Sequence, residues 1–330
     1  MRTSMSRRDF VTSVSSLAAA GAFTTLDLPA VQGAAPRSKV FIVRTDDRRK
    51  GVAEIIKLMK IPSPKGKAVV IKPNFNTADP TPGSTHNDTL RQLMTELLER
   101  DARALTIAER SGPPSTKKVM EDKGVFDLAS ELKAGVVNFE ELADADWVKV
   151  APRDSHWTSE LFVPRVVAQA PYLVSTCCLK THGFGGVYSM SVKLAVGMTP
   201  KRLMREMHGS REHMRRMIAE INTGFTPDVI IMDGVEAFVD GGPSQGKKIA
   251  ANVFVGGTDR VAVDAVGLAI LKELGSNAAI MDRKIFEQEQ IQRAVELGLG
   301  VAGPDQIDLV TGDPVSRAYA AKLQARLAQG

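Results

Sequence analysis

The sequence predicts an α/β protein of three layers, in which a mostly parallel sheet carries helices on both faces. Short apolar runs such as residues 39–43 (KVFIV) and 67–72 (KAVVIK) have the length and composition of buried strands. Longer segments between such runs, for example residues 87–100, have apolar residues at helical spacing. The two kinds of segment alternate from residue 38 onward, and this alternation is typical of parallel sheets because helical crossovers join parallel neighbours.

The individual elements follow from the same two patterns. Short apolar runs predict strands at 39–43, 67–72, 104–109, 135–139, 172–179, 228–234, 252–257 and 307–312. Helical spacing predicts helices at 51–60, 87–100, 188–197, 200–222, 259–275 and 285–297, two short helices in 115–133 broken at Gly124, and a helix at the C-terminal end. Asp259 is expected to cap the helix that follows it. Residues 140–170 show no regular pattern.

The composition indicates one domain over residues 38–330 and excludes several classes of protein. The chain has 330 residues, of which 43% are hydrophobic, so it can bury a large core. A net charge of +5 and an aromatic content of 5% argue against a nucleic acid partner. The basic residues between 201 and 216 are interpreted as a solvated helix face, with a docking surface for a partner as the weaker alternative. The motifs GxSxG, HExxH and CxxC are absent from the sequence.

Residues 1–37 resemble a twin-arginine signal peptide with its linker. Arg7 and Arg8 precede an Ala-rich run, and small residues follow at 33–35. The run is too short for a stable span of the ~30 Å hydrocarbon core of a membrane. We therefore expect export by the twin-arginine translocation machinery to the periplasm or otherwise out of the cytoplasm, and no stable transmembrane span. The alternative is an amphipathic helix that begins with two arginines.

The two cysteines are adjacent, at Cys177 and Cys178, and indicate a buried strand. Neighbouring cysteines seldom pair with each other because the geometry is strained, and two cysteines do not hold an iron–sulfur cluster by themselves. We expect neither a disulfide nor an iron–sulfur cluster.

Polar residues follow several of the predicted strands at the point where each ends. In open α/β sheets, ligands bind beyond the carboxyl ends of the strands. Lys72 and Asn74 follow one strand, Glu109 and Arg110 lie at the end of a second, Lys180 and His182 follow a third, and Asp233 ends a fourth. These side chains are expected to share one cleft. The alternative for Lys72 is a solubilising charge at the edge of the sheet.

The loop after Lys180 contains glycines and leads toward a predicted helix that carries Lys193. Gly185 and Gly186 would let the backbone approach a ligand, and a glycine-rich loop before a helix suits a phosphate or carboxylate. The order of residues matches neither a P-loop nor a dinucleotide-binding fingerprint. The alternative for His182 is a structural histidine.

Residues 233–246 combine carboxylates with glycines. Asp233, Glu236 and Asp240 are hard oxygen ligands that could hold Mg²⁺ or Ca²⁺, although the segment does not match an EF-hand loop. Gly242 and Gly246 would shape a ligand-binding loop. An ordinary surface turn is the alternative, so a divalent metal is possible and the cofactor is otherwise unknown.

Three segments together resemble the family called domain of unknown function 362. They are VVIKPNFN, CLKTHGFGGVYSMSVKLAVG and the stretch from PDVIIMDG to VAVDAVG, and the resemblance covers about residues 39–275. The positions that match the family pattern are Lys72, Pro73, Asn74, Lys180, His182, Lys193, Asp233, Gly242, Pro243, Gly246, Asp259 and Asp264. Many members carry a ferredoxin-like module that this chain lacks, and Leu194 stands where the family tends to have Asn. The resemblance implies an architecture and candidate positions but no reaction.

The interpretation that follows is an exported enzyme acting on an anionic small molecule or cofactor. Its candidate catalytic residues are Lys180, His182, Lys193 and Asp233. Histidine is the natural acid or base among them, since its unperturbed pKa is ~6.5. The alternative is a periplasmic binding protein that captures an anionic ligand without turning it over.

Overall fold

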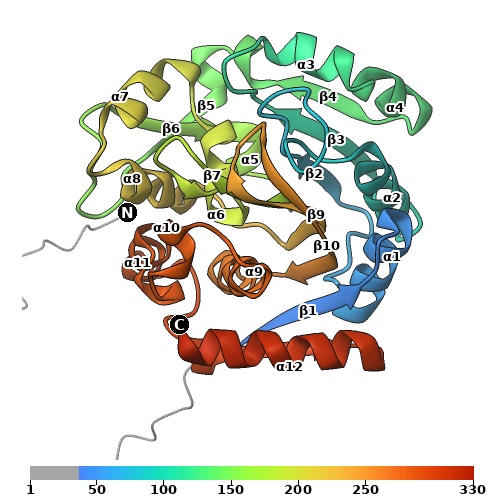
Figure 1. The fold of residues 1–330 in the computed structure, drawn as a ribbon. Helices are drawn as coiled ribbons and strands as arrows, with labels where there is room; N and C mark the ends of the chain where they lie inside the picture. The colour runs from blue at the N-terminus through green and yellow to red at the C-terminus, as the bar shows by residue number, and fades with distance from the viewer. Residues whose placement is uncertain (1–36) are drawn as a thin grey trace, which may run out of the picture. The chain divides into compact units, whose positions relative to one another are not determined.

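A computed structural model describes residues 37–330 of the chain. Its main sheet has nine strands, eight of them in the order β11-β1-β10-β9-β7-β2-β3-β4, with β8 paired to β7 (Figure 1). The strands are β1 (Ser38–Arg44), β2 (Ala68–Lys72), β3 (Ala104–Glu109), β4 (Gly135–Asn138), β7 (Tyr172–His182), β8 (Val187–Tyr188), β9 (Val229–Gly241), β10 (Gly246–Gly257) and β11 (Ile307–Thr311). A separate antiparallel pair is formed by β5 (Trp147–Val150) and β6 (Leu161–Pro164).

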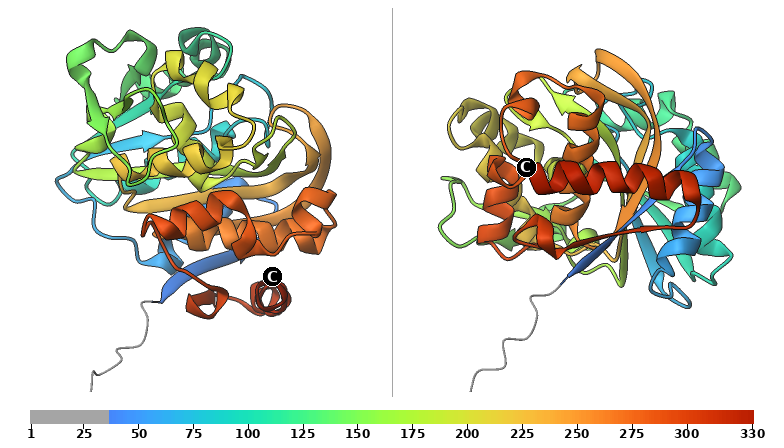
Figure 2. Two further views of the ribbon diagram at one scale, coloured as in Figure 1. Left: turned by 90° about the vertical axis from the view of Figure 1, so that its left-hand side faces the viewer. Right: turned by 60° about the horizontal axis from the view of Figure 1, so that its bottom comes forward.

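The helices lie on both faces of this sheet (Figure 1). They are α1 (Arg48–Met59), α2 (Asn87–Leu98), α3 (Thr116–Asp122), α4 (Val125–Glu131), α5 (Arg165–Ala168), α6 (Ser191–Leu194), α7 (Met204–Gly209), α8 (Met214–Ile221), α9 (Arg260–Leu274), α10 (Ala278–Met281), α11 (Glu289–Glu296) and α12 (Pro314–Gln329). Buried residues of α1 to α4 form one apolar core with the sheet, and those of α8, α9, α11 and α12 form a second. Helix α12 packs on α9, β1 and β11 (Figure 2).

The predicted three-layer α/β fold is confirmed. Five of the strand pairs, including β2–β3 and β7–β9, are parallel, whereas β1–β10, β9–β10 and β7–β8 are antiparallel. Helix starts are capped as their sequences indicate: Asp259 accepts hydrogen bonds from the amides of Val261 and Ala262 at α9. Asp313 does the same at α12, where Pro314 is the first helical residue. Both caps satisfy amides that the helix itself leaves unpaired.

Two strands extend further than their apolar runs predict. Strand β7 continues through Lys180 to His182 because Thr181 and His182 pair with β8 and Lys180 pairs with Phe238 of β9. Strands β9 and β10 continue to Gly241 and from Gly246, so the predicted glycine-rich loop 233–246 is mostly a β-hairpin that curves beyond the rest of the sheet (Figure 2). Polar residues in both extensions hide the strand pattern.

The helical predictions for 188–197 and 200–222 are too long. In the first segment, Tyr188 belongs to β8 and the α-helix spans Ser191–Leu194, followed by a 3₁₀ turn. The second consists of a short 3₁₀ turn, α7, α8 and a further 3₁₀ turn. Helical spacing alone does not reveal these interruptions, because short turns preserve the position of the apolar residues.

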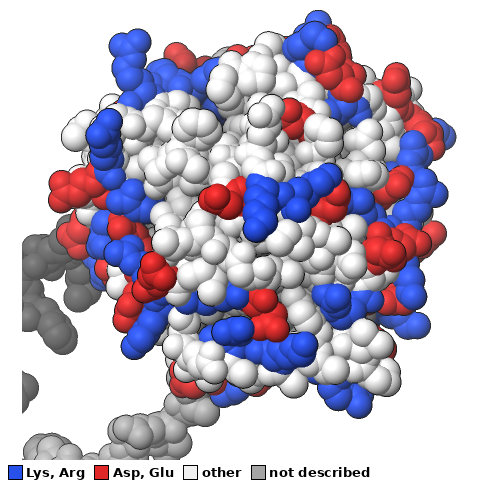
Figure 3. All heavy atoms as spheres, in the orientation of Figure 1, with Lys and Arg blue, Asp and Glu red and all other residues white. Residues whose placement is uncertain are grey.

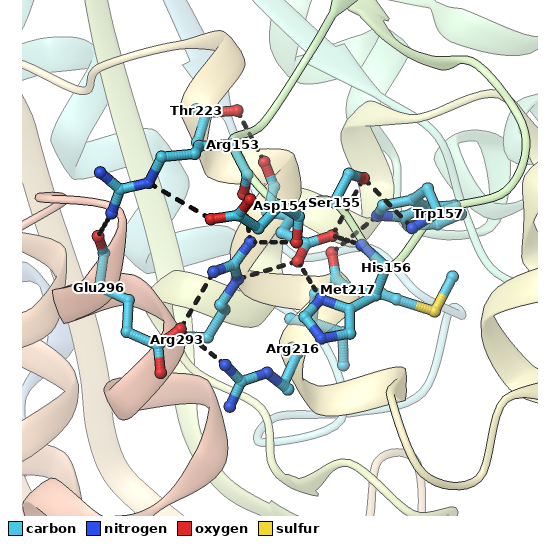
Figure 4. Close-up of polar contacts among 12 residues, drawn as sticks. Arg153, Asp154, Ser155, His156, Trp157, Arg216, Met217, Thr223, Arg293 and Glu296 are labelled. Carbon is cyan, nitrogen blue, oxygen red and sulfur yellow. Dashed lines mark hydrogen bonds and ion pairs between the residues drawn. The ribbon is translucent and has the colours of Figure 1, made fainter.

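A buried ionic cluster holds the long connection between β5 and β6 against α8 and α11. Its centre is Glu220, whose side chain is fully buried and accepts hydrogen bonds from His156 Nδ1 at 2.6 Å and Arg293 Nε at 2.9 Å. Arg293 also donates to Glu296 and to the carbonyls of Arg153 and Asp154 (Figure 4). We call Glu220, His156, Arg293 and Glu296 the Glu220 cluster.

Basic and acidic side chains are interspersed on the face drawn in Figure 3, around its rim and across its middle, and areas that carry neither lie between them. This mixed pattern agrees with the small net charge. Among residues 37–330, none of the helices has the length and apolar character needed to cross a membrane. The predicted signal peptide lies outside the described residues.

Candidate functional site

A cavity of about 480 Å³ lies where β2, β3 and β7 end. This volume falls in the range of small-molecule sites, roughly 300–1,000 Å³. Its wall comes from these strand ends, from the segment around α6 and α7, and from the tip of the β9–β10 hairpin. The polar residues of the wall are Lys72, Asn74, Asn76, Thr77, Glu109, Arg110, Lys180, His182, Ser189, Lys193, Lys201, His208 and Ser244. Lys72, Asn74, Lys180, His182 and Lys193, which the sequence predicts to share a cleft, are therefore brought together, whereas Asp233, which is predicted to lie with them, is not among the residues that line the cavity.

Lys72 and Glu109 form a buried ion pair at the ends of two neighbouring strands. The side chains are each 1% exposed, and the Lys72 amine also donates to its neighbouring carbonyl, Pro73 O, at 2.7 Å. The second carboxylate oxygen of Glu109 accepts from Phe75 N at 2.8 Å. Burial raises the pKa of Glu109 and lowers that of Lys72, and each charge opposes the shift of the other. The pair fixes the loop after β2, so Lys72 serves the structure of the wall and is no edge charge.

Lys180 is fully buried and its amine is shared among three acceptors. These are Gly83 O at 2.6 Å, Asn74 Oδ1 at 3.3 Å and Pro243 O at 3.3 Å. All three are neutral, so the positive charge on Lys180 is not cancelled by a carboxylate. Burial lowers the pKa of Lys180. The residue ties β7 to the loop after β2 and to the tip of the β9–β10 hairpin.

His182 lies at the end of β7 and is 7% exposed. Its Nδ1 atom is buried and has no hydrogen-bond partner within residues 37–330. Burial, together with the charges of Lys193 and Lys180, lowers the pKa of His182 to about 2. The imidazole is therefore neutral at physiological pH. A buried ring nitrogen without a partner is costly in a folded protein, and such an atom is often explained by a ligand.

Lys193 is a second residue of the wall whose side-chain nitrogen has no hydrogen-bond partner within residues 37–330. Its side chain is 9% exposed, and its amine makes neither a hydrogen bond nor an ion pair within the described part of the chain. Burial, with the charges of Lys180 and Arg110, lowers the pKa of Lys193 to about 7. At neutral pH a large fraction of the amine is unprotonated, which makes it both a base and a nucleophile.

The first turn of helix α6, which carries Lys193, is fixed by hydrogen bonds to the side chains of Asp264 and Asn222. Asp264 of α9 is fully buried and accepts from Ser191 N at 2.7 Å and from Val192 N at 3.0 Å. Asn222 Nδ2 donates to Val192 O at 3.0 Å. Burial raises the pKa of Asp264 to about 7, against the opposing effect of the two amides. Asp264 thus meets the backbone of α6 and positions Lys193 without touching its amine.

The turn between β7 and β8 brings His182 and Lys193 together. A Cβ atom at Gly186 would lie 2.7 Å from Lys193 Cε and 2.9 Å from His182 Nδ1, so only glycine leaves room for both. Val187 follows with a φ of 64°, a strained conformation for a β-branched residue. Gln290 Nε2 secures the turn by donating to Gly186 O at 2.6 Å.

The four predicted ligand-binding glycines lie in turns that support the cavity wall. Gly185 and Gly186 belong to the β7–β8 turn, and Gly242 and Gly246 belong to the β9–β10 hairpin. Gly242 has a φ of 73°, and a Cβ there would lie 2.2 Å from Thr181 O. The wall itself is formed by their neighbours Phe184, Pro243 and Ser244.

The three predicted metal ligands are not brought together. They are spread along β9, which rises about 3.3 Å per residue. Asp233 is fully buried and binds Arg48 Nε at 3.0 Å and Thr89 Oγ1 at 2.7 Å, while Glu236 binds Arg48 and Lys248. Asp240 accepts from Asn277 at the exposed end of the strand. Residues 37–330 contain no group of three or more His, Cys, Asp or Glu side chains that could hold a metal ion.

Four charged or titratable residues of the wall are not among the predicted catalytic or ligand-binding residues. Glu109 and Arg110, at the end of β3, were predicted to share the cleft, and both line it. Lys201 and His208 come from the segment after α6, where the sequence shows only a solvated basic helix. Arg110 is 3% exposed, donates to Ser111 O at 3.0 Å, and has its pKa lowered by burial to about 10, so it remains charged at neutral pH.

The cavity as a whole is electropositive. Lys72, Lys180, Arg110 and Lys201 contribute positive charge, and Glu109 is the carboxylate among the wall residues of the described chain. Lys201 is partly offset by Glu140 at 2.7 Å. Buried charges act strongly because little water screens them. The arrangement can attract an anion and place it beside an amine and an imidazole that are free to react.

Comparisons with known proteins identify a family whose sequence model the chain matches. The sequence model of the family described as Domain of unknown function (DUF362) matches residues 69–269, which include Lys72, Lys180, His182 and Lys193. No curated protein matches the chain. A solved structure, that of the lactate racemase apoprotein from Thermoanaerobacterium thermosaccharolyticum, is similar to it at 12% sequence identity and a TM-score of 0.43, over 87% of this chain and 86% of that chain.

Proposed function

The chain belongs to the family described as domain of unknown function (DUF362), and from this premise we propose that it is an enzyme whose cavity binds an anionic small molecule and acts on it through Lys193 and His182. One observation carries the proposal. His182 and Lys193 both line the cavity, and His182 Nδ1, which is buried and has no partner in residues 37–330, packs with Lys193 Cε against Gly186. A ligand in the cavity would give the Lys193 amine the partner that buried polar groups normally have.

The charges of the wall support an anionic ligand. Lys180 and Arg110 donate their hydrogen bonds to neutral carbonyl and amide oxygens, so their positive charge extends into the cavity. A carboxylate or phosphate would be attracted, and its approach would also stabilise protonated Lys193. The proton on Lys193 is therefore coupled to the bound anion.

The pKa values support acid–base chemistry centred on Lys193. A general base or acid works best when its pKa lies near the working pH, and that of Lys193 is lowered to about 7. His182, whose pKa is about 2, remains neutral and can accept or donate one hydrogen bond according to its tautomer. Lys193 would move the proton, and His182 would orient the ligand.

Ligand binding tests the proposal directly. We expect acetate, oxalate, malonate or phosphate to raise the melting temperature of the purified protein and to give a saturable signal in isothermal titration calorimetry. Lys193→Met and His182→Ala should abolish this binding without lowering the melting temperature of the unliganded protein. Lys149→Met, at an exposed lysine, is the matched control and should bind as the wild type does.

The outcomes separate the competing functions. If none of the anions binds, the proposal is wrong. If an anion binds tightly and no chemical change is detected by mass spectrometry in any bound compound, the protein is a binding protein and the enzymatic part of the proposal fails. If His182→Ala unfolds the protein, His182 is a structural residue.

We also propose that residues 1–37 direct export by the twin-arginine route. The support is the pair Arg7-Arg8 ahead of an Ala-rich run. Replacing both arginines by lysine should retain the protein in the cytoplasm, as measured by cell fractionation. Full export of that variant would contradict the proposal.

A further inference from the structure

We infer that Lys193 is a nucleophile and that the substrate is an oxo acid, a small carboxylate with an aldehyde or ketone group that condenses with the Lys193 amine to an imine. This inference rests on the proposed function, because it requires the cavity to bind an anion. It adds the reacting group of the substrate and the bond that forms.

The lysines of the cavity wall differ in what their amines already bind. Lys72 pairs with Glu109, and Lys201 pairs with Glu140 and donates to Pro114 O at 3.1 Å. Lys180 donates to three oxygen acceptors. An amine that donates to such acceptors is kept protonated and has no lone pair to offer. Within the described residues, Lys193 is the lysine of this wall whose amine is uncommitted.

The position of Lys193 suits attack on a bound molecule. Its helix is fixed by the carboxylate of Asp264 and the amide of Asn222, and its Cε atom packs on Gly186. The side chain is therefore directed into the cavity with little freedom, which favours reaction with a ligand held in one orientation.

The surroundings also favour the neutral form of the amine. Burial and the charges of Lys180 and Arg110 lower the pKa of Lys193 to about 7. Compared with an ordinary lysine of pKa ~10.4, its neutral fraction at pH 7 is larger by about a thousandfold. Desolvation and neighbouring cations are the means by which enzymes activate a lysine toward carbonyl groups.

The condensation needs no other reactant. The lone pair of Lys193 Nζ adds to the carbonyl carbon, and the carbonyl oxygen takes up a proton to form a carbinolamine. Loss of water, which carries the former carbonyl oxygen and both amine hydrogens, leaves a C=N bond to Nζ. The proton that the carbonyl oxygen takes up is the one that the attacking nitrogen loses, and His182, which lines the cavity beside Lys193, can hold the carbinolamine by one hydrogen bond.

The positive charge of the cavity wall explains why the substrate should carry a carboxylate. Arg110 and Lys201 line the same cavity as Lys193, so a carboxylate attracted by these cations would enter the cavity that contains the amine. An aldehyde of similar size without a charge would lack this attraction. Charge should therefore decide which carbonyl compounds react.

Reductive trapping tests the inference. The purified protein is incubated with glyoxylate or pyruvate and reduced with sodium cyanoborohydride, and the adduct is located by peptide mass spectrometry. We expect one adduct at Lys193, its loss in Lys193→Met, and little adduct when propionaldehyde replaces the oxo acids. Lys149→Met should be labelled as the wild type is.

The possible results separately test the imine, the proposed function, the oxo acid assignment and the identity of the nucleophile. If oxalate binds but neither oxo acid is trapped at Lys193, the imine is wrong while the proposed function stands. If no anion binds, both fail. If propionaldehyde labels Lys193 as well as glyoxylate does, Lys193 is nucleophilic but the oxo acid assignment is overturned. If the label is spread over exposed lysines and persists in Lys193→Met, Lys193 is not the nucleophile.

Discussion

The cavity and the Glu220 cluster are both buried groups of ionisable side chains, and they differ in how far those side chains are paired. In the Glu220 cluster, Glu220 meets His156 and Arg293, and Arg293 meets three further oxygens (Figure 4). In the cavity wall, Lys193 and one nitrogen of His182 meet no polar partner within residues 37–330. The buried charges of the Glu220 cluster are compensated within the protein, whereas the positive charge that Lys193 carries when protonated is not.

This difference separates structural charges from candidate functional ones. Burying an ion costs several kcal/mol, and a structural ion recovers this through its partners. A site that is meant to receive a ligand leaves that compensation to the ligand. Removing a member of the Glu220 cluster should therefore damage the fold, whereas removing Lys193 should damage binding alone.

The largest effect is expected from Arg293→Met. This change leaves the fully buried Glu220 carboxylate without its main cation, and breaking such a pair costs about 3–5 kcal/mol. The free energy of unfolding, measured by urea denaturation, should fall by this amount. The exposed pair Lys149–Glu160 provides the control, since Lys149→Met should cost about 0–1 kcal/mol. If Arg293→Met and Lys149→Met lowered the free energy of unfolding equally, the Glu220 cluster would not be a set of structural charges.

A smaller loss in the free energy of unfolding is expected from Asp264→Ala. This variant tests whether a charge that lies beside the cavity can still be a structural one. Asp264 supports α6 beside the cavity, yet it is fully partnered, so it belongs with the structural charges. Leaving the amides of Ser191 and Val192 unpaired should cost about 1–3 kcal/mol and should weaken anion binding as well. Asp264→Asn keeps one acceptor oxygen and should recover part of both losses. Full anion binding by a destabilised Asp264→Ala would show that α6 needs no such support.

A change of stability of opposite sign is expected from Lys193→Met. The unfolded chain holds the Lys193 proton up to pH 10.5, but the folded chain releases it near pH 7. Below about pH 7 the folded protein therefore contains the buried positive charge of Lys193, which lowers its free energy of unfolding. This destabilisation declines as the pH rises from about 7 to 10.5. The variant should be more stable than the wild type at the acidic end, and its advantage should shrink toward the alkaline end. Urea denaturation at several pH values measures this trend.

A loss of stability in Lys193→Met at the acidic end would contradict the comparison, because it would mean that the protonated amine has a partner. The cations Lys180 and Arg110, the imidazoles of His182 and His208 and the Lys72–Glu109 pair all border the same cavity. Lys149→Met, whose amine is exposed, should show no comparable trend with pH.

Sequence patterns predicted the elements of the sheet well and the details of the site less well. Runs such as 104–109 identify strands because burial on both faces demands continuous apolar residues. The extension of β7 through Lys180 and His182 depends on β8 and β9, which supply backbone partners that no local pattern records. Asp233 illustrates the same limit, since its partner Arg48 is 185 residues away in the sequence.

The positions of Lys72, Lys180 and His182 followed from their places after strands, because parallel strands bring their carboxyl ends to one edge. The lack of a partner for Lys193 could not be predicted, since it depends on every neighbour in three dimensions. The acidic segment 233–246 looked like a loop because glycines and carboxylates are common in turns, but cross-strand pairing from Gly246 to Gly241 makes it a hairpin.

Lys180 has a consequence for the order in which the chain folds. Its amine joins Gly83, 97 residues away, to Pro243, 63 residues away, so three distant segments must be in place before the cavity exists. Contacts of such long range form late because closing large loops is slow. A fragment that lacks any of the three segments would therefore not form the cavity. A ligand that binds the cavity would stabilise the whole folded chain, because it binds only the folded state.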